Sequence, residues 1–258
     1  MDLIYNKILE TLKKTGLPAF AVLDFDNTCI INDITEAALT YLATNNLFKD
    51  KNLVDEKFKN YSRAVFENYY KLIDENKIIE AYEFISKILS GFSVDEIEGL
   101  VKKVIKFEGE NISETEIWGI KINKGLRPRK NVFELINFLK TNGVDVWIVS
   151  ASLEILVKET IKYFGIEANV IGIRNALAGN KITQELQKPL SMFGEKIDCI
   201  KKFIDQNKKP IFGIGDSMND LQMLEYCEVK AAIDRNNTLT KIAKQNSWFL
   251  VQNNIKDV

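Results

Sequence analysis

Apolar positions recur along this chain with two different spacings. From residue 33 to about 117 they follow the three-to-four-residue period of helices, and no strand pattern interrupts them. After Gly125, short apolar runs alternate with helical segments of about 10 to 15 residues, which indicates parallel strands covered by helices on both faces. We therefore predict an α/β fold with a doubly wound parallel sheet, formed by residues 1–32 and 125–258, and an α-helical insertion at 33–124.

Capping residues and glycines set the limits of the predicted elements. Ser93, with Glu96 three positions later, forms the capping box of a helix at 93–107. Gly179 and Asn180 mark the turn of a hairpin. Further strands are predicted at 20–24, 144–150, 168–173, 210–216 and 229–233. Further helices are predicted at 3–15, 33–48, 58–89, 131–143, 152–165 and 195–207, with one more between the last two strands and another closing the chain.

Composition and charge narrow the classes of function. With 258 residues, 46% of them hydrophobic, the chain can bury a sizeable core. Its formal net charge of -1 gives no bulk attraction to nucleic acid or to an anionic membrane, so we expect neither as a partner. No run of about 18 apolar residues predicts a membrane span. The first residues lack the pattern of a signal peptide, so a cytoplasmic location is the expectation.

Histidine is absent, and the three cysteines form no C-x-x-C pair. Serine hydrolase triads, cysteine–histidine nucleophiles and histidine-ligated zinc or iron sites all require imidazole, so these classes are excluded. The scattered cysteines also indicate no disulfide framework. Any chemistry here must use carboxylates, hydroxyls and lysines, with or without a hard metal ion.

Polar residues stand where three of the predicted strands end. Asp24 and Asp26 end the first strand, and Ser150 and Asp216 end two later ones. The carboxyl ends of parallel strands share one edge of a sheet, where ligands collect. Three acids packed together repel one another unless a cation neutralises them. Since carboxylate and water ligands suit Mg²⁺, we predict a magnesium site at this edge.

The same set of residues can act on a phosphomonoester. One of the carboxylates can attack phosphorus and form a covalent phosphoryl intermediate. Thr28, Ser150 and a lysine can supply hydrogen bonds and positive charge to the phosphoryl oxygens. Asp26 can supply the proton that the leaving alkoxide needs.

Four short segments stand in order along the chain: DFDNT, IVSAS, the GEK that contains Lys196, and GDSMND. Together they resemble the four motifs of the haloacid dehalogenase-like (HAD) phosphatase superfamily, over about residues 18–32 and 125–235. The resemblance implies a Rossmann-like core, with the helical insertion in the position of the family's cap domain. The IVSAS and GNKIT segments look like those of the phosphoserine and phosphocholine phosphatase branches.

The resemblance implies a role for each matched residue near the first two strand ends. Asp24 would be the nucleophile and would also ligate magnesium. Asp26 would be the general acid and then the general base, with its backbone carbonyl on the metal. Thr28 would orient Asp26 or the phosphoryl oxygens, and Ser150 would donate to a phosphoryl oxygen. An acid at position 26 favours a phosphatase over the dehalogenases and phosphonate hydrolases of the superfamily.

The remaining matched residues lie toward the C-terminus. Lys196 would neutralise the nucleophile and the phosphate, and Lys188 is the alternative for this role. Asp216 would bind magnesium directly, with Asp220 in or just behind its coordination shell. Asn219 would contact phosphate or water.

The insertion decides the substrate. In the phosphoserine phosphatase branch, an acid nine places after the nucleophile and a cap arginine hold the amino acid; here Asp33 takes the first position and Arg63 is the candidate for the second. Aromatic rings can also enclose a quaternary ammonium group. We hypothesise a small phosphomonoester with a cationic or zwitterionic end. The aromatic candidates, which can equally form the core of a helical cap, are Tyr61, Phe66, Tyr69, Tyr70, Tyr82, Phe84 and Trp118.

Two alternatives to magnesium-dependent hydrolysis through an aspartyl-phosphate remain open. A phosphotransferase would use the same residues to pass the phosphoryl group to an acceptor alcohol. A catalytically idle HAD-like binding module would keep the fold alone. The presence of all the acids favours an enzyme, and the sequence gives no indication of the oligomeric state.

Overall fold

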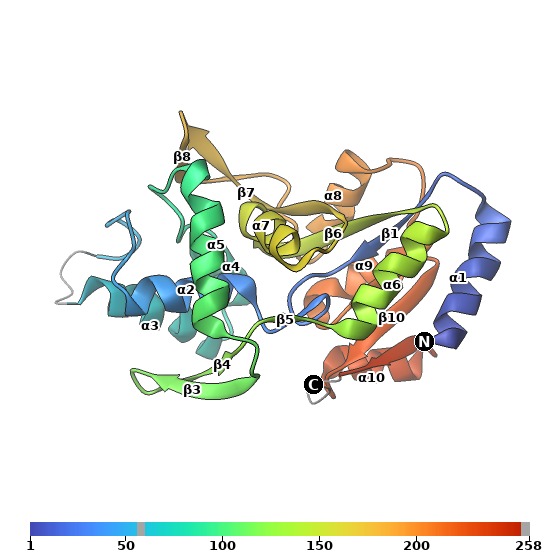
Figure 1. Cartoon of the computed structure of the whole chain (residues 1–258), viewed down its shortest axis with the longest axis horizontal. Helices are drawn as coiled ribbons and strands as arrows, with labels where there is room; N and C mark the ends of the chain where they lie inside the picture. The colour runs from blue at the N-terminus through green and yellow to red at the C-terminus, as the bar shows by residue number, and fades with distance from the viewer. Residues whose placement is uncertain (56–59, 254–258) are drawn as a thin grey trace.

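The computed structural model describes residues 1–55 and 60–253. It shows a core built around a sheet and, beside it, a group of helices with a small hairpin (Figure 1). Among the described residues, no helix combines the length and the apolar character that crossing a membrane requires.

The core sheet has seven strands, with β1 (Ala19–Leu23) near its middle. β1 is parallel to both of its neighbours, β6 (Val144–Leu153) and β9 (Phe212–Gly215). Within this sheet only the β7–β8 pairing is antiparallel. The predicted α/β fold with a mostly parallel sheet is therefore confirmed. The strand order is β11 (Phe249–Gln252), β10 (Val229–Asp234), β9, β1, β6, β7 (Asn169–Ala178) and β8 (Lys181–Gln187).

Helices cover both faces of this sheet, and the side chains of β1 show why. Every residue of β1 is buried; Ala21 and Leu23 pack into one hydrophobic cluster, whereas Phe20 and Val22 pack into another. Since successive side chains of a strand point to opposite faces, two separate helical layers are needed. The first layer contains α1 (Asp2–Thr15), α6 (Lys130–Thr141) and α7 (Glu154–Phe164), and the second contains α8 (Glu195–Phe203), α9 (Leu221–Tyr226) and α10 (Thr238–Gln245).

The inserted segment, which we call the cap, is not wholly helical as predicted. It ends in a hairpin whose strands, β3 (Ser113–Ile117) and β4 (Ile120–Lys124), are joined by Trp118 and Gly119 with positive φ angles. The residues of β3 are exposed or half-buried, so the hydrophobic pattern gave no strand signal there. The helices of the cap are α2 (Ile34–Thr44), α3 (Tyr61–Asp74), α4 (Ile78–Ile85) and α5 (Val94–Glu108).

Several predicted limits also differ from the structure. The segment predicted as one helix at 58–89 contains both α3 and α4, separated by a turn at Asn76 with φ 58°, and its predicted start at Phe58 lies outside the described residues. The predicted helices at 33–48 and 195–207 are shorter, and β11 was not predicted. The capping box of α5 and the turn between β7 and β8 are confirmed.

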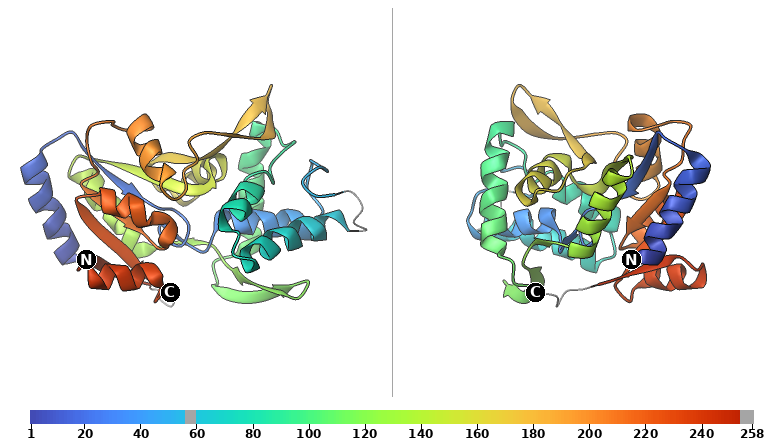
Figure 2. Two further views of the ribbon diagram at one scale, coloured as in Figure 1. Left: turned by 180° about the vertical axis from the view of Figure 1, so that it is seen from behind. Right: turned by 45° about the vertical axis from the view of Figure 1, so that its right-hand side comes forward.

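The cap meets the core at the two chain crossings and at the β7–β8 hairpin, among other contacts. The two chain crossings lie side by side because β2 (Ile30–Ile31) pairs with β5 (Arg127–Pro128). Beyond them, the Asn32 amide donates to the Gly125 carbonyl oxygen at 2.8 Å. The β7–β8 hairpin reaches over to the start of α5, where the Val94 amide donates to the Asn180 carbonyl at 3.0 Å (Figure 2). The domain limits at 33 and 125 stay a prediction.

We expect Gly125→Ala to destabilise the protein more than Gly119→Ala. Both glycines have positive φ, but a Cβ at Gly125 would lie 2.4 Å from the Asn111 carbonyl oxygen, whereas a Cβ at Gly119 has no atom within 4 Å. The expected losses in the free energy of unfolding are about 2–4 kcal/mol and about 1 kcal/mol. Urea titration followed by circular dichroism measures both, and equal losses would contradict the steric explanation.

Candidate active site

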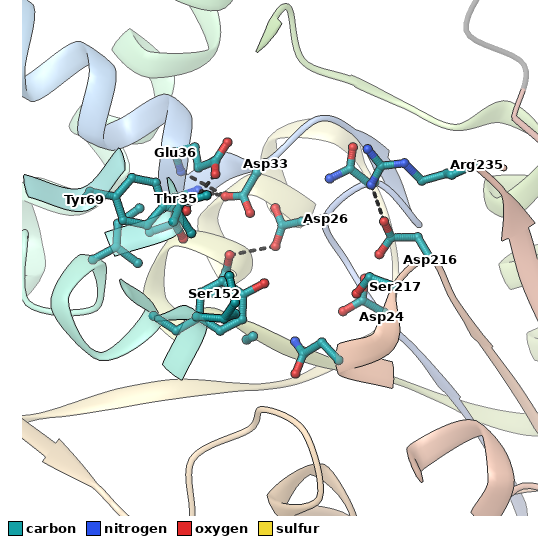
Figure 3. A pocket seen from close by; sticks show the side chains of 17 residues that line it. Asp24, Asp26, Asp33, Thr35, Glu36, Tyr69, Ser152, Asp216, Ser217 and Arg235 are labelled. Atoms are coloured by element: carbon teal, nitrogen blue, oxygen red, sulfur yellow. Dashed lines mark hydrogen bonds and ion pairs between the residues drawn. The ribbon is translucent and has the colours of Figure 1, made fainter. Parts of the chain in front are cut away.

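Asp24, Asp26 and Asp216, three of the predicted strand-end residues, lie together at one edge of the sheet (Figure 3). Asp24 follows β1, Ser150 lies on the neighbouring β6, and Asp216 follows β9 on the other side. Because these strands are parallel neighbours, their carboxyl ends bring residues from distant parts of the sequence together.

Lys196 lies between two of the acids. Its side chain is fully buried, and Nζ donates to Asp24 Oδ1 at 2.9 Å and to Asp220 Oδ1 at 2.6 Å. Burial alone lowers the pKa of the Lys196 ammonium, but the Asp220 and Asp24 carboxylates outweigh it and the net shift of the pKa is upward. Lys188 is exposed and pairs with Glu195 at 3.6 Å. The structure therefore places Lys196, and not Lys188, beside the predicted nucleophile.

Asp220 positions the loop that carries Asp216. While its Oδ1 accepts from Lys196, its Oδ2 accepts from the amides of Asp216 at 3.0 Å and Ser217 at 3.2 Å. Asn219, next to it, accepts a hydrogen bond from the Phe193 amide at 2.5 Å. Asp220 therefore already has partners for both oxygens within the protein.

Three buried acids form a cluster that could hold a metal ion. Oxygen atoms of Asp24, Asp216 and Asp220 lie within 4.8 Å of one another. Burial, followed by the Asp220 carboxylate, raises the pKa of Asp216 to about 6, although its ion pair with Arg235 opposes the shift. Burial and Asp220 likewise raise the pKa of Asp24 well above its ordinary value, with Lys196 opposing. A divalent cation would relieve this repulsion, and carboxylate oxygens are the donors that Mg²⁺ takes.

Asp26 receives hydrogen bonds from both parts of the protein. Its Oδ1 accepts from the Ile34 amide, the first of α2 in the cap, at 2.8 Å. Its Oδ2 accepts from the hydroxyls of Ser152 at 2.7 Å and Ser150 at 3.2 Å on β6. Burial raises the pKa of Asp26, and the hydrogen bonds from Ser152, Ile34 and Ser150 oppose this shift.

Thr28 is fully buried, and in the described part of the chain its hydroxyl has no hydrogen-bond partner. The loop around it is held by Arg129, which donates to the carbonyl oxygens of Thr28 at 3.1 Å and Asn27 at 3.0 Å. Asp24 and Asp26 line the cavity described next, whereas Thr28 and Ser150 are not among its described lining residues.

A cavity of about 180 Å³ lies between the core and the cap. Asp24, Asp216 and Arg235 lie on its core side, and Asp26 lies between them and the cap residues (Figure 3). Asp33 Oδ1 caps α2 by accepting from the amides of Thr35 at 2.7 Å and Glu36 at 2.9 Å. The cap residues that line the cavity are Asp33, Thr35, Glu36, Tyr69, Ile73, Ile78, Tyr82 and Ile85.

The cap side therefore includes two further acids and two aromatic rings. The Tyr69 hydroxyl donates to Glu36 Oε1 at 2.7 Å. Burial, followed by the neighbouring Asp26 and Glu36 carboxylates, raises the pKa of Asp33. Of the aromatic residues proposed from the sequence, Tyr69 and Tyr82 line the cavity, whereas Phe66 packs against Trp118.

Arg63, the predicted cap arginine, does not line the cavity. It is exposed at the start of α3, where Nε pairs with Glu67 at 2.8 Å. The prediction that Arg63 binds the substrate in the cavity is therefore not supported by its position.

Among the cavity residues that were not predicted from the sequence, three polar or charged ones had a signal. Ser152 follows Ser150 by two positions, and alternate residues of a strand share a face. Glu36 follows Asp33 by three positions, so both lie on one side of α2. Arg235 follows the end of β10, at the same edge as the other strand ends.

The family model for haloacid dehalogenase-like hydrolases matches residues 21–225. A phosphorylcholine phosphatase from Pseudomonas aeruginosa is 25% identical to this chain, over 82% of this chain and 71% of the relative. Among solved structures, a protein of unknown function from Anaerococcus prevotii has a TM-score of 0.73 at 24% identity, over 96% of this chain and 90% of its own. A substrate-bound phosphoserine phosphatase has a TM-score of 0.56 at 16% identity, over 92% of this chain and 93% of its own.

The solved structures confirm the predicted fold, and the matched family spans most of the chain. The predictions that the chain is an enzyme of the HAD-like hydrolases, and that it is similar to the phosphoserine and phosphocholine phosphatases, are confirmed. The chain belongs to the haloacid dehalogenase-like hydrolase family.

Proposed function

We propose that this protein hydrolyses a small phosphomonoester whose leaving group carries a positive charge, through an aspartyl-phosphate on Asp24. The observation that carries the proposal is the cavity itself. Asp24 with its Lys196 partner lies at the core side, and two carboxylates with two tyrosine rings lie at the cap side. The core side would take the phosphoryl group of one small molecule, and the cap side would take its positively charged end.

Asp24 and Asp26 perform the two half-reactions. In the first, an oxygen of the Asp24 carboxylate attacks phosphorus, and Asp26 gives its proton to the departing alkoxide. In the second, Asp26 takes a proton from water, which attacks the phosphorus of the acyl phosphate and releases Asp24. The raised pKa of Asp26 supports this role, because the group must be protonated at the start of the first step.

Asp24 and Asp216 would hold Mg²⁺, together with the backbone carbonyl of Asp26, and Asp220 would lie behind them. When bound, the ion neutralises the phosphoryl oxygens and the nearby carboxylates. Lys196 keeps the Asp24 carboxylate oriented and reduces its repulsion from the incoming phosphate. Asn219, which lines the cavity, is a proposed donor to the phosphoryl oxygens or to water, and Ser150 would donate to a phosphoryl oxygen on turning away from Asp26 Oδ2.

The cap side favours an ammonium end without a carboxylate. Asp33 and Glu36 attract a cation there, and tyrosine rings bind ammonium groups by cation–π attraction. Among the described lining residues the basic side chain is Arg235, which pairs with Asp216 on the core side. The carboxylate of phosphoserine would face two acids, and no basic side chain of the described residues lines the cap side. The similar Pseudomonas enzyme, a phosphorylcholine phosphatase, supports an amino alcohol ester.

Phosphate release from a panel of esters tests the reaction and its nucleophile. With magnesium, we expect turnover that is best on phosphocholine or phosphoethanolamine, weaker on phosphoserine and sugar phosphates, and lost with EDTA. Asp24→Asn should reduce kcat by at least about 10³-fold with little change in folding. Added alcohols that accept the phosphoryl group in place of water would instead indicate a phosphotransferase. A folded, magnesium-bound protein without turnover on any ester would overturn the proposal.

Removing the buried ammonium should damage both stability and activity. Lys196→Met leaves Asp24 and Asp220 facing each other unpaired, so we expect the free energy of unfolding to fall by about 3–5 kcal/mol and kcat to fall by at least about 10²-fold. The matched control is Lys188→Met, which removes an exposed lysine and should change neither quantity appreciably. Urea titration and steady-state kinetics measure both variants, and a similar loss in the control would argue against the special role of Lys196.

The effect of Ser152→Ala should depend on the leaving group. Ser152 contacts Asp26 at 2.7 Å, so its loss should misplace the proton donor. An alkoxide needs that proton, whereas p-nitrophenolate is a good leaving group without it. We expect kcat to fall about tenfold on an alkyl phosphate and to change little on p-nitrophenyl phosphate. Ser150→Ala should lower both rates, and equal losses for Ser152→Ala would show that its role is only structural.

A further inference from the structure

Arg235 is the one basic side chain among the described residues that line the cavity. The acids of the same lining are Asp24, Asp26, Asp33, Glu36 and Asp216. A phosphomonoester carries about 1.5 to 2 negative charges at pH 7, so these acids repel it. Lys196 is fully buried, is not among the described lining residues and already donates to two carboxylates. The phosphoryl group therefore needs positive charge inside the cavity, where Arg235 lies.

Two hydrogen bonds hold Arg235 and its loop against Asp216. Arg235 follows β10, and its Nη1 donates to Asp216 Oδ2 (Figure 3). In the same loop, Asn237 Nδ2 donates to the Asp216 carbonyl oxygen at 2.7 Å. Carboxylate oxygens of Asp216 and Asp24 lie within 4.8 Å of each other. The guanidinium is therefore bound to the acid next to the proposed nucleophile, on the core side of the cavity.

The Arg235 guanidinium keeps hydrogen-bond donors for a ligand. It has several N–H groups and stays charged at any pH at which the protein is folded. Among the described residues, its ion-pair partner is Asp216, bonded through Nη1, and 33% of the Arg235 side chain is exposed. The planar guanidinium suits phosphate oxygens, which accept charge-assisted hydrogen bonds from it. One part of the group can therefore stay on Asp216 while another N–H donates to a phosphoryl oxygen.

We propose that Arg235 is a substrate-binding residue whose guanidinium, oriented by Asp216, donates a hydrogen bond to a phosphoryl oxygen. The inference rests on the proposed function and deepens it, because it assigns the phosphoryl group a protein cation inside the cavity in addition to the buried Lys196. The contact involves the phosphoryl group and not the leaving group. It therefore acts on different esters alike, and also on inorganic phosphate, the product.

Isothermal titration calorimetry with inorganic phosphate, at saturating Mg²⁺, measures this contact without turnover. The variants are Arg235→Gln, which removes the charge, and Arg235→Lys, which keeps the charge without the planar group. The matched control is Lys244→Gln, which removes an exposed lysine paired with Asp234 at 3.8 Å, outside the described cavity lining. Mg²⁺ is also titrated alone, kcat/KM is measured on phosphocholine and p-nitrophenyl phosphate, and thermal unfolding shows that each variant is folded.

We expect Arg235→Gln to weaken phosphate binding by about 10- to 100-fold, through the loss of one charge-assisted hydrogen bond. kcat/KM should fall by a similar factor on both esters, because they carry the same phosphoryl group. Arg235→Lys should lose less, and Lys244→Gln should change neither quantity appreciably. Mg²⁺ should bind to Arg235→Gln at least as tightly as to the wild type, since Asp216 loses a competing cation.

Unchanged phosphate binding in Arg235→Gln would overturn the inference. A loss of activity that comes with weaker Mg²⁺ binding and disappears at saturating Mg²⁺ would also overturn it, because Arg235 would then only position Asp216. The proposed function stands in both cases. A wild type that hydrolyses no ester, yet binds phosphate more tightly than Arg235→Gln, would overturn the proposed function and leave the Arg235 contact intact.

Discussion

The Lys196 ammonium, buried between the carboxylates of Asp24 and Asp220, is the contact on which the arrangement of the site depends. A buried ammonium is unfavourable without anionic partners, and two close carboxylates are unfavourable without a cation. The buried ammonium and the two carboxylates therefore stabilise one another. The three residues come from α8, from the end of β1 and from the turn after β9, so one cluster of charges joins three separate elements. Asp216 is placed through the same cluster, because Asp220 also binds its amide.

Asp26 has a comparable place between the core and the cap. Its hydrogen bonds come from Ser152 on β6 and from the Ile34 amide at the start of α2. The N-terminal end of a helix carries partial positive charge, so the first turn of α2 favours the carboxylate that it contacts. Asp26, the proposed proton donor, is thus held by the same helix that carries Glu36 at the cavity, so two of the proposed functional groups depend on one helix.

The core of the site could be predicted from the sequence, and its cap side could not. The grouping of Asp24, Asp216 and Ser150 could be predicted from their positions near the ends of strands, because the carboxyl ends of parallel strands lie at one edge of a sheet. Residues on helices obey no such rule. Whether Arg63 or Glu36 faces the cavity depends on how α2 and α3 pack, and the periodicity of each helix alone does not fix this. β3 and β11 were missed because short, partly exposed strands leave a weak hydrophobic pattern.

The pairing of β2 with β5 has a consequence for how this protein can vary. The chain leaves the core at Ile31 and returns at Arg127, two residues that are directly paired across the small sheet. The ends of the inserted segment therefore meet at a fixed, short separation, and an insertion of any length with adjacent ends fits the same place. The strand ends that carry the charges need not move when such a segment grows, shrinks or is exchanged. The architecture is modular: the clustered charges belong to one edge of the core sheet, and the other side of the cavity belongs to a segment with adjacent ends.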